Sequence, residues 1–519
     1  MKREKIFTII LLSIVLLIGF LLRIWDFGSL PAGLHQDEAS IAVEASSLYH
    51  FGEDRNGEAY PVHFIAWGSG QNALYGYLLV PLVPLGMTPT VIRLPMLITG
   101  LASILLMYFI GRKVFSPATG ILAAALMAIS PWHIMLSRWA LESNILPFVF
   151  LLGFLFAIHF DRGWLWVTAA CVFLGISLYA YGTAYLLVPL FLVWLFAIVL
   201  SQHRYSWWQL GIGLLLFLAI AFPIGLFILV NSFSLPGMHI GPVSIPRLPA
   251  DPRYEVLTGI RHGGTLVDYL KNFYSLVRIL FLQTDGLIYN GLPAFGFLFP
   301  GAVLFALAGT GRILQNWKNA RSPQVLLFLG WAGLAFLLGI VQPPVINRIN
   351  VLFPALILLV AWCLEGLWHQ GKLIFSCLTL GMAISTCLFA REYFLAEGQT
   401  KAGLAFNEGF IQALQQIPAQ TDLPVCVTST VNMPYIYVLL LHPEDPAVIA
   451  LNIQYETPRD AFRVVDRLGK YYFGSPNCPD TSRQYRIAQR GGEALPDAWA
   501  GLFTMKEYGD FDLYIPKTQ

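Results

Sequence analysis

The chain has 519 residues, of which 56% are hydrophobic, 14% aromatic and only 12% charged, and its formal net charge is +2. Soluble globular domains carry about 25% charged residues, so this composition excludes an ordinary soluble protein and predicts one that crosses a membrane several times. The basic residues are spread among short loops rather than gathered on one patch, so we expect no nucleic-acid partner.

About eleven apolar runs have roughly the 17 to 25 residues needed to cross a bilayer. They lie near residues 6–25, 90–110, 118–136, 144–160, 164–181, 184–200, 208–230, 292–310, 323–341, 349–368 and 372–391. No clear small-x-small cleavage site follows the first run, which we interpret as a retained helix rather than a signal peptide. The pattern predicts a mainly α, polytopic membrane protein.

The basic residues predict the orientation of these helices. Lys2, Arg3 and Lys5 precede the first run, and further Lys and Arg residues fall in alternate short loops. By the positive-inside rule the N-terminus is cytoplasmic, and two loops of some 60 residues, 26–89 and 231–291, lie outside. We expect a multi-pass protein of the plasma (inner) membrane with its working residues on the outer face, in contact with membrane lipids.

Two adjacent carboxylates, Asp37 and Glu38, follow His35 in the first outer loop. The pair lies between an apolar anchor and a long aromatic loop, where partial desolvation would make a carboxylate a better base. The simpler alternative is a solvated pair of charges at a helix end. The one-sided polarity of the rest of the chain favours chemistry.

The composition becomes mixed polar and apolar from about residue 393, which predicts a small extracytoplasmic α/β C-terminal domain. The expected elements are an amphipathic helix in Leu404–Ile417, a strand at Val425–Thr430, a helix near Tyr435–Leu441 and a strand at Phe511–Ile515. Four of the six cysteines fall within apolar runs, which leaves Cys426 and Cys478. In an oxidising compartment these two are expected to form a disulfide; the alternative is two buried thiols that never meet.

Several motifs, in this order, resemble the protein mannosyltransferase-like branch of the GT-C superfamily, which is related to the lipid A aminoarabinose transferases. They are the Asp-Glu pair after one anchor helix, residues 70–77 (GQNALYGY), residues 93–95 (RLP), residues 130–133 (SPWH) with 137–142 (SRWALE), and residues 347–348 (NR) before 351–356 (VLFPAL). The resemblance covers roughly residues 1–370. It implies a GT-C fold and a polyprenyl-phosphate-linked sugar donor.

Sugar transfer from a lipid phosphate needs a carboxylate that takes the proton of the acceptor hydroxyl. We assign Asp37 as this base and Glu38 as its helper; the resemblance favours the aspartate. A single base with direct attack inverts the anomeric carbon. No cofactor is certain, but Asp37 holding a divalent cation that clamps the phosphate is an alternative.

The departing phosphate needs a positive group, for which Arg348 and Arg138 are the candidates because a guanidinium binds phosphate in a bidentate way. Arg348 could instead be an interface anchor. Arg138 could instead pair with Glu142, four residues further on, and Glu142 is itself a candidate substrate contact.

The first outer loop supplies the remaining candidate substrate contacts, Gln71, Asn72 and Tyr75, which follow a Gly-Ser-Gly turn. His35 is a weaker candidate, because an outer-loop histidine is more often structural.

We therefore expect a transmembrane catalytic domain over residues 1–392 and an outer domain over 393–519. The expected function is inverting glycosyl transfer to a hydroxyl of a glycan, lipid or protein acceptor. The alternative is a non-catalytic or transport protein for lipid-linked sugars, such as a flippase. A flippase would need a polar path open to both leaflets, whereas this chain concentrates its polarity on one side.

Overall fold

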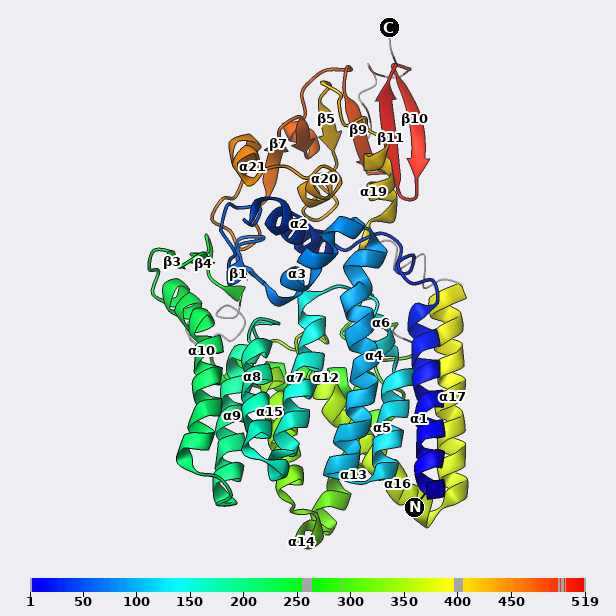
Figure 1. Ribbon diagram of the computed structural model, residues 1–519. Helices are drawn as coiled ribbons and strands as arrows, with labels where there is room; N and C mark the ends of the chain where they lie inside the picture. The colour runs from blue at the N-terminus through cyan, green and yellow to red at the C-terminus, as the bar shows by residue number, and fades with distance from the viewer. Residues whose placement is uncertain are drawn as a thin grey trace. The chain divides into compact units, whose positions relative to one another are not determined.

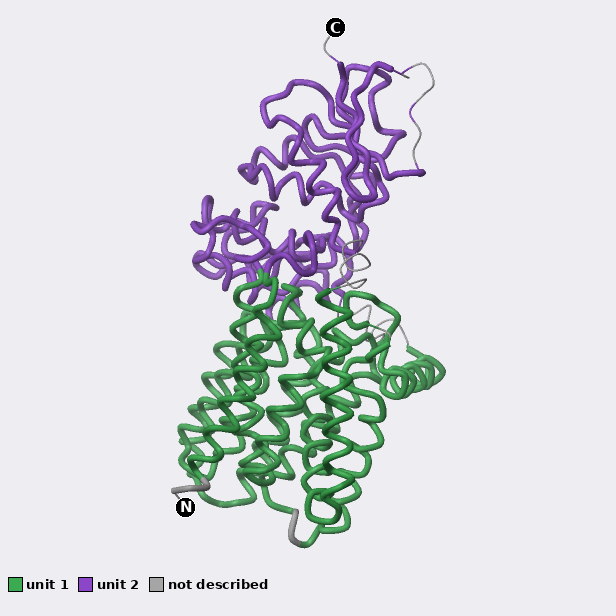
Figure 2. Tube along the Cα trace, turned by 90° about the vertical axis from the view of Figure 1, so that its right-hand side faces the viewer, with its two compact units in different colours: residues 1–27, 93–225, 254–398 green, residues 28–92, 226–253, 399–519 purple. Residues whose placement is uncertain are grey.

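A computed structural model describes residues 2–253, 264–292, 294–395, 405–492, 495, 499 and 501–517. The chain forms two compact units (Figure 2). Unit 1 comprises residues 1–27, 93–225 and 254–398, and unit 2 comprises residues 28–92, 226–253 and 399–519. Unit 2 thus gathers three segments that lie far apart in the sequence. The second predicted outer loop includes residues 254–263, which lie outside the described residues.

Long helices dominate the transmembrane part of the chain (Figure 1). Seven helices among the described residues are long and apolar enough to cross a membrane: α1 (Lys2–Ile24), α4 (Pro89–Val114), α9 (Ala184–Ser201), α10 (Trp207–Ser232), α15 (Pro323–Val341), α16 (Leu352–Gln370) and α17 (Lys372–Leu395). Shorter apolar helices occupy the other predicted runs: α5 (Pro117–Ile129), α7 (Leu146–Ile158), α8 (Trp164–Ser177) and α13 (Ala302–Gln315). The predicted polytopic, mainly α fold is confirmed, while the count of eleven crossings stays a prediction.

Further helices lie between these segments in the sequence: α6 (Pro131–Leu136), η2 (Glu142–Ile145), η3 (Phe160–Arg162), α12 (Leu266–Leu282) and α14 (Trp317–Ala320). The structure splits the predicted run 118–136, because α5 ends at Ile129 and Ser130 caps a new helix that begins at Pro131. It also starts α13 ten residues later than the run 292–310 suggests. Gly301 there has φ +81°, a left-handed conformation, and it marks the helix boundary.

Helix α16 lies at the centre of unit 1, where it packs against α5, α13, α15 and α17. In the most apolar 18-residue stretch of α16, 72% of the residues are buried, whereas in that of α1 only 6% are buried. Helices α4 and α5 approach very closely, since a Cβ atom added to Gly120 would lie 2.5 Å from the carbonyl oxygen of Tyr108. Small residues at such crossings let two backbones pack in van der Waals contact, which drives helix association in a bilayer.

The first predicted outer loop is folded within unit 2. It contains α2 (Gln36–Phe51), β1 (His63–Phe64), β2 (Gln71–Asn72), α3 (Leu74–Leu79) and η1 (Val80–Leu85), and residues 226–253 add β3 (Met238–Ile240) and β4 (Val243–Ile245). Helix α2 packs against α3, η1 and a C-terminal helix, α20 (Tyr435–Leu441). Every residue from Glu38 to Leu48 is buried, so the polar side chains of α2 must find partners inside unit 2.

The C-terminal part of unit 2 is an α/β arrangement. Its seven-stranded sheet has the order β10-β11-β9-β5-β8-β7-β6, in which β5 runs parallel to both β8 and β9 and the other pairs are antiparallel. The strands are β5 (Val425–Val427), β6 (Ile453–Tyr455), β7 (Val465–Leu468), β8 (Tyr471–Phe473), β9 (Tyr485–Gln489), β10 (Phe503–Tyr508) and β11 (Phe511–Pro516). Tyr508 pairs with Phe511, so Gly509, with φ +54°, and Asp510 form a two-residue hairpin turn.

Helices α19 (Glu408–Gln415), α20 and α21 (Pro446–Asn452) accompany the sheet, with a one-turn helix, η4 (Ser475–Asn477). The predicted strand at 425–430, helix near 435–441 and strand at 511–515 correspond to β5, α20 and β11. Of the predicted helix 404–417, the structure has α19, and Leu404 lies outside the described residues. Strands β6 to β10 were not anticipated, because strands of three to six residues are too short to give a clear periodicity.

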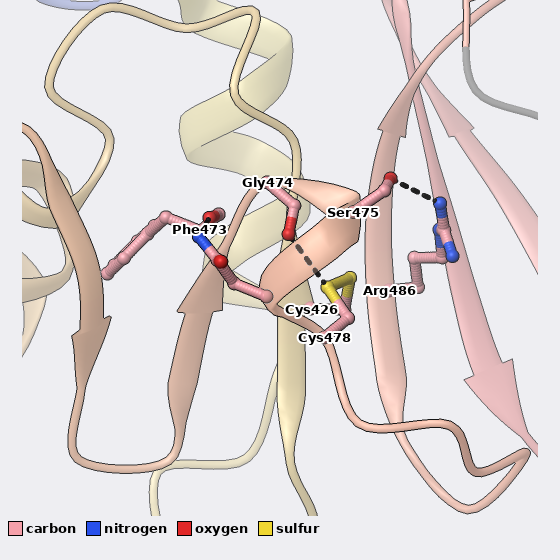
Figure 3. The surroundings of a disulfide bond; sticks show 7 residues. Cys426, Phe473, Gly474, Ser475, Cys478 and Arg486 are labelled. Carbon is pink, nitrogen blue, oxygen red and sulfur yellow. Dashed lines mark hydrogen bonds between the residues drawn. A yellow bond between two sulfur atoms is a disulfide. The ribbon is translucent and has the colours of Figure 1, made fainter. Parts of the chain in front are cut away.

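Cys426 on β5 and Cys478 after η4 form a disulfide with a Cα–Cα distance of 5.5 Å (Figure 3). It closes a loop with a sequence separation of 52 residues. We expect the double substitution Cys426→Ala/Cys478→Ala to lower the free energy of unfolding of unit 2 by about 4 kcal/mol, because the cross-link restricts the unfolded chain. Thermal unfolding of the full-length protein in detergent would measure this.

The matched control is Cys377→Ala/Cys387→Ala, which removes two exposed free thiols. An equal change in unfolding temperature for the two double variants, or quantitative alkylation of Cys426 in non-reduced folded protein, would contradict the expectation.

His63 on β1 gives unit 2 a predicted pH dependence. Its ring stacks on Phe227 with a centroid distance of 4.4 Å, and burial lowers its pKa to about 4. An unfolded histidine has a pKa of about 6.5. Between these values the unfolded state binds the extra proton, so stability is full above pH 6.5 and falls by about 3 kcal/mol as the pH drops to 4.

The measurement is the unfolding temperature of wild type and of His63→Phe between pH 7 and pH 4. Phenylalanine keeps the stacking on Phe227 and does not titrate, so its profile should be flatter. The exposed His50 supplies the control, His50→Phe, whose profile should match that of wild type. Parallel profiles for His63→Phe and wild type would refute the assignment.

Candidate active site

The N-terminus of α2 is fixed by a capping box. The Nδ1 atom of His35 accepts a hydrogen bond from the Asp37 backbone N–H at 3.3 Å, and the His35 backbone N–H donates to Glu38 Oε2 at 3.0 Å. This reciprocal pair satisfies two of the free N–H groups at the helix start. It places Asp37 in the first turn, where the helix dipole favours a negative charge.

The Asp37 carboxylate lies between two rings. Trp67 Nε1 donates to Oδ1 at 3.0 Å, and His35 Nδ1 lies 3.5 Å from Oδ2. The Asp37 side chain is 17% exposed, so it is shielded but still accessible. A carboxylate with one oxygen held by a donor and a solvent-accessible edge is suited to accept a proton from a bound hydroxyl.

Glu38 has a different setting from Asp37. It is fully buried, and one of its oxygens serves the capping box. This contact is structural, and the predicted role of Glu38 as a helper in catalysis stays a prediction.

Two of the three predicted loop contacts lie on β2. Gln71 Nε2 donates to the Asp37 carbonyl oxygen at 3.4 Å, and Gln71 Oε1 accepts from the Ser40 hydroxyl at 3.0 Å. Asn72 pairs with His63 in the β1–β2 ladder. The Tyr75 hydroxyl donates to the carbonyl oxygen of Ile92 at 2.8 Å, and its side chain is fully buried. The structure thus brings Gln71 to the Asp37 helix and gives Tyr75 a packing role; substrate contact stays a prediction for all three.

Sequence reasoning missed a buried ion pair beside this site. Arg55 Nη1 lies 3.1 Å from Glu44 Oε1, and the two side chains are 3% and 0% exposed. The same guanidinium donates to the Ser40 hydroxyl at 2.8 Å. Its Cζ atom lies 5.0 Å from the ring centroid of Trp67. One signal was present in the sequence: Asp37, Ser40 and Glu44 recur at helical spacing and form a polar stripe on one face of α2.

Asp54 precedes this arginine and differs from Glu44 in its partners. Its Oδ1 atom accepts the backbone N–H groups of Asn56 at 2.8 Å and Glu58 at 3.0 Å. Burial, followed by the charge of Glu44, raises the pKa of Asp54 to about 8. Burial thus favours the protonated form of the Asp54 carboxyl.

The remaining predicted residues belong to unit 1. Arg138 is fully buried, and its guanidinium donates to the carbonyl oxygens of Arg23 at 2.7 Å and Asp26 at 3.0 Å. Glu142 is buried at the start of η2. Arg348 is half-buried and donates to the Pro343 carbonyl oxygen at 3.3 Å. Two of the Arg138 nitrogens are thus occupied by backbone, and the phosphate role stays a prediction for both arginines.

A metal role for Asp37 has no support from a ligand cluster. Among the described residues, no group of three or more His, Cys, Asp or Glu side chains is placed to hold a metal ion. The divalent cation stays an alternative.

A family model described as dolichyl-phosphate-mannose-protein mannosyltransferase matches residues 47–227. No curated protein matches the chain. Among solved structures, ArnT from Cupriavidus metallidurans bound to undecaprenyl phosphate is similar with a TM-score of 0.55 and 15% identity, covering 98% of this chain and 97% of that one. Its apo form gives a TM-score of 0.54 at 14% identity, with coverage of 99% and 98%.

The oligosaccharyltransferase of Archaeoglobus fulgidus, in complex with Zn and sulfate, is similar with a TM-score of 0.51 and 15% identity over 83% of this chain. This chain covers 61% of the length of that archaeal protein. At these identities the likeness concerns the fold. Together with the partial family match it confirms the predicted fold: this multi-pass membrane protein has the GT-C fold that ArnT also has.

Proposed function

We propose that this chain is a membrane glycosyltransferase that moves a monosaccharide from a polyprenyl-phosphate donor to an acceptor hydroxyl. The observation that carries the proposal is the Asp37 carboxylate, held by Trp67 at the start of α2 and still accessible. The fold shared with ArnT, a protein solved with undecaprenyl phosphate bound, supports the class of donor. The acceptor is a glycan, a lipid or a protein.

In the proposed reaction the acceptor oxygen attacks the anomeric carbon while Asp37 takes the hydroxyl proton. The new carbon–oxygen bond forms as the bond between the anomeric carbon and the phosphate oxygen breaks, and the polyprenyl phosphate leaves with the electron pair. Direct displacement inverts the anomeric carbon. Trp67 keeps Oδ1 occupied, which leaves Oδ2, on the His35 side, to accept the proton.

Arg348 is our first candidate for the leaving phosphate, because it is half-buried and, among the described residues, its guanidinium has one hydrogen bond, to a backbone carbonyl. The rest of the guanidinium fork suits a bidentate phosphate contact. Arg138 is the second. The distribution of Lys and Arg supports a cytoplasmic N-terminus, with the reaction on the outer face of the plasma (inner) membrane.

The test is transfer from a panel of radiolabelled polyprenyl-phosphate sugars to membrane extracts by purified full-length protein. Wild type should transfer one of them, and the linkage formed should have the anomeric configuration opposite to that of the donor. Donor-dependent transfer with retention would refute inversion. Passage of a fluorescent polyprenyl-phosphate sugar across vesicles, with no transfer from any donor, would favour a flippase.

A further inference from the structure

We propose that Arg55 is a positioning residue for Asp37 and acts through Trp67. We further propose that the C-terminal segment of unit 2 (residues 399–519) holds Arg55 and Trp67 in place through Tyr435 and Arg463. This inference rests on the proposed function, since it concerns the base of that reaction. It gives the C-terminal segment a role in assembling the active site.

Arg55 is held firmly on its own side of the site. Arg55 Nη1 forms an ion pair with Glu44 Oε1 at 3.1 Å, and the Arg55 backbone N–H donates to Glu44 Oε2 at 3.0 Å. Both side chains are essentially inaccessible to water. In a buried setting such a pair keeps its geometry, because separating the charges would leave each without solvent.

Two series of contacts lead from Arg55 to Asp37. In the first series, the Arg55 guanidinium lies 5.0 Å from the Trp67 ring centroid, and the Trp67 indole donates a hydrogen bond to Asp37 Oδ1. A cation near an indole ring is attracted to it and makes its N–H group a stronger donor. In the second, Arg55 donates to Ser40, Ser40 to Gln71, and Gln71 to the Asp37 carbonyl oxygen. Arg55 is thus linked to both the side chain and the backbone of Asp37.

The C-terminal segment contacts both Arg55 and Trp67, the first two members of the first series. The Tyr435 ring lies 5.9 Å from Arg55 Cζ and packs edge-on against Trp67, with a centroid distance of 6.2 Å. The Arg463 backbone N–H donates to the Trp67 carbonyl oxygen at 2.8 Å, and its guanidinium donates to Asn56 Oδ1 at 2.9 Å. Arg463 therefore links Trp67 to Asn56, the residue that follows Arg55.

The loop that carries Trp67 and the C-terminal segment lie too close together to accommodate added atoms. Gly68 forms an isolated β-bridge with Phe462. A Cβ atom on Gly68, which has φ +125°, would lie 2.4 Å from the carbonyl oxygen of Asp460. The loop that carries Trp67 is thus shaped to receive residues 460–463, and the site that contains Asp37 is completed by residues some 400 positions away.

The test uses the full-length protein with [15N]-indole-labelled tryptophan, in which the Trp67 resonance is assigned by its loss in Trp67→Phe. We expect Arg55→Lys and Tyr435→Leu each to shift this Nε1 resonance, as Asp37→Asn should. Tyr435→Leu leaves the Arg55–Glu44 ion pair intact, so it tests the contact with Trp67 even if Arg55→Lys fails to fold. An unmoved Trp67 resonance in both variants would overturn the proposal.

Kinetics supply the second readout. Trp67→Phe should lower kcat by about tenfold or more, the order expected for a lost hydrogen bond to a charged group, with little change in KM. Trp331→Phe is the matched control, because that indole is also fully buried and donates to a backbone carbonyl, that of Val351, at 3.2 Å. Equal kcat values for the two variants would contradict the positioning role. A wild type that transfers no sugar would refute the proposed function, while the resonance would still test the positioning.

Discussion

Replacement of Asp37 by asparagine is expected to lower the rate of sugar transfer by about 10²- to 10⁴-fold, the range that a positioned general base contributes. Asparagine keeps the size of the side chain, and its amide oxygen can still accept the Trp67 N–H, so unit 2 should stay folded. It cannot take a proton from the acceptor hydroxyl. The measurement is a single-turnover rate with the active donor, together with donor binding by equilibrium titration.

The control for Asp37→Asn is Asp422→Asn, which makes the same chemical change at an exposed carboxylate of unit 2. It should transfer at the wild-type rate. Equal rates for Asp37→Asn and wild type would remove Asp37 from the mechanism. Loss of donor binding together with the rate would instead assign Asp37 to substrate binding.

Replacement of Arg55 by methionine is expected to destabilise unit 2 by about 3–5 kcal/mol, the cost of leaving one partner of a buried ion pair alone. Glu44 is fully buried in α2, so without Arg55 its charge loses its ion-pair partner and has no water to replace it. Hydrogen exchange of the α2 amide groups would report the loss as a lower opening free energy. The effect should be confined to unit 2, since both partners lie there.

Two variants distinguish this cost from a general effect of removing an arginine. Arg490→Met breaks a pair with Asp512 in which the arginine is 46% exposed, and it should cost much less stability than Arg55→Met, because water screens an exposed pair. Glu44→Gln combined with Arg55→Met removes the isolated charge and should recover a large part of the lost stability. If the double variant is as unstable as Arg55→Met alone, an isolated Glu44 charge is not the cause.

The sequence by itself determined the transmembrane part of this protein. Each predicted apolar run contains a helix, because a segment in a bilayer can satisfy its backbone hydrogen bonds only within itself or in a closed barrel. The start of α6 and the late start of α13 are also local events, set by Ser130-Pro131 and by Gly301. These features depend on neighbours within a few residues, so a sequence pattern is enough to find them.

Part of the site was also readable from the sequence. Asp37 stood out because an acidic pair follows an anchor helix, and its proximity to Gln71 follows from their place in one loop. The Cys426 and Cys478 pair was reached by elimination, since the other four cysteines lie in apolar runs. In each case few alternatives remained, so the residues could be proposed without the structure; the catalytic role of Asp37 stays a prediction.

Only the tertiary structure decided how Asp37 is held. In the sequence, Trp67 is one aromatic residue among many, and Arg55 is one of many basic residues. Tyr435 lies in a domain that was expected to be separate. Their meaning depends on the folding of residues 28–92, 226–253 and 399–519 into one unit. Contacts such as Arg463 to Trp67 span some 400 residues, and no local propensity encodes them, because burial and charge pairing are properties of the assembled core.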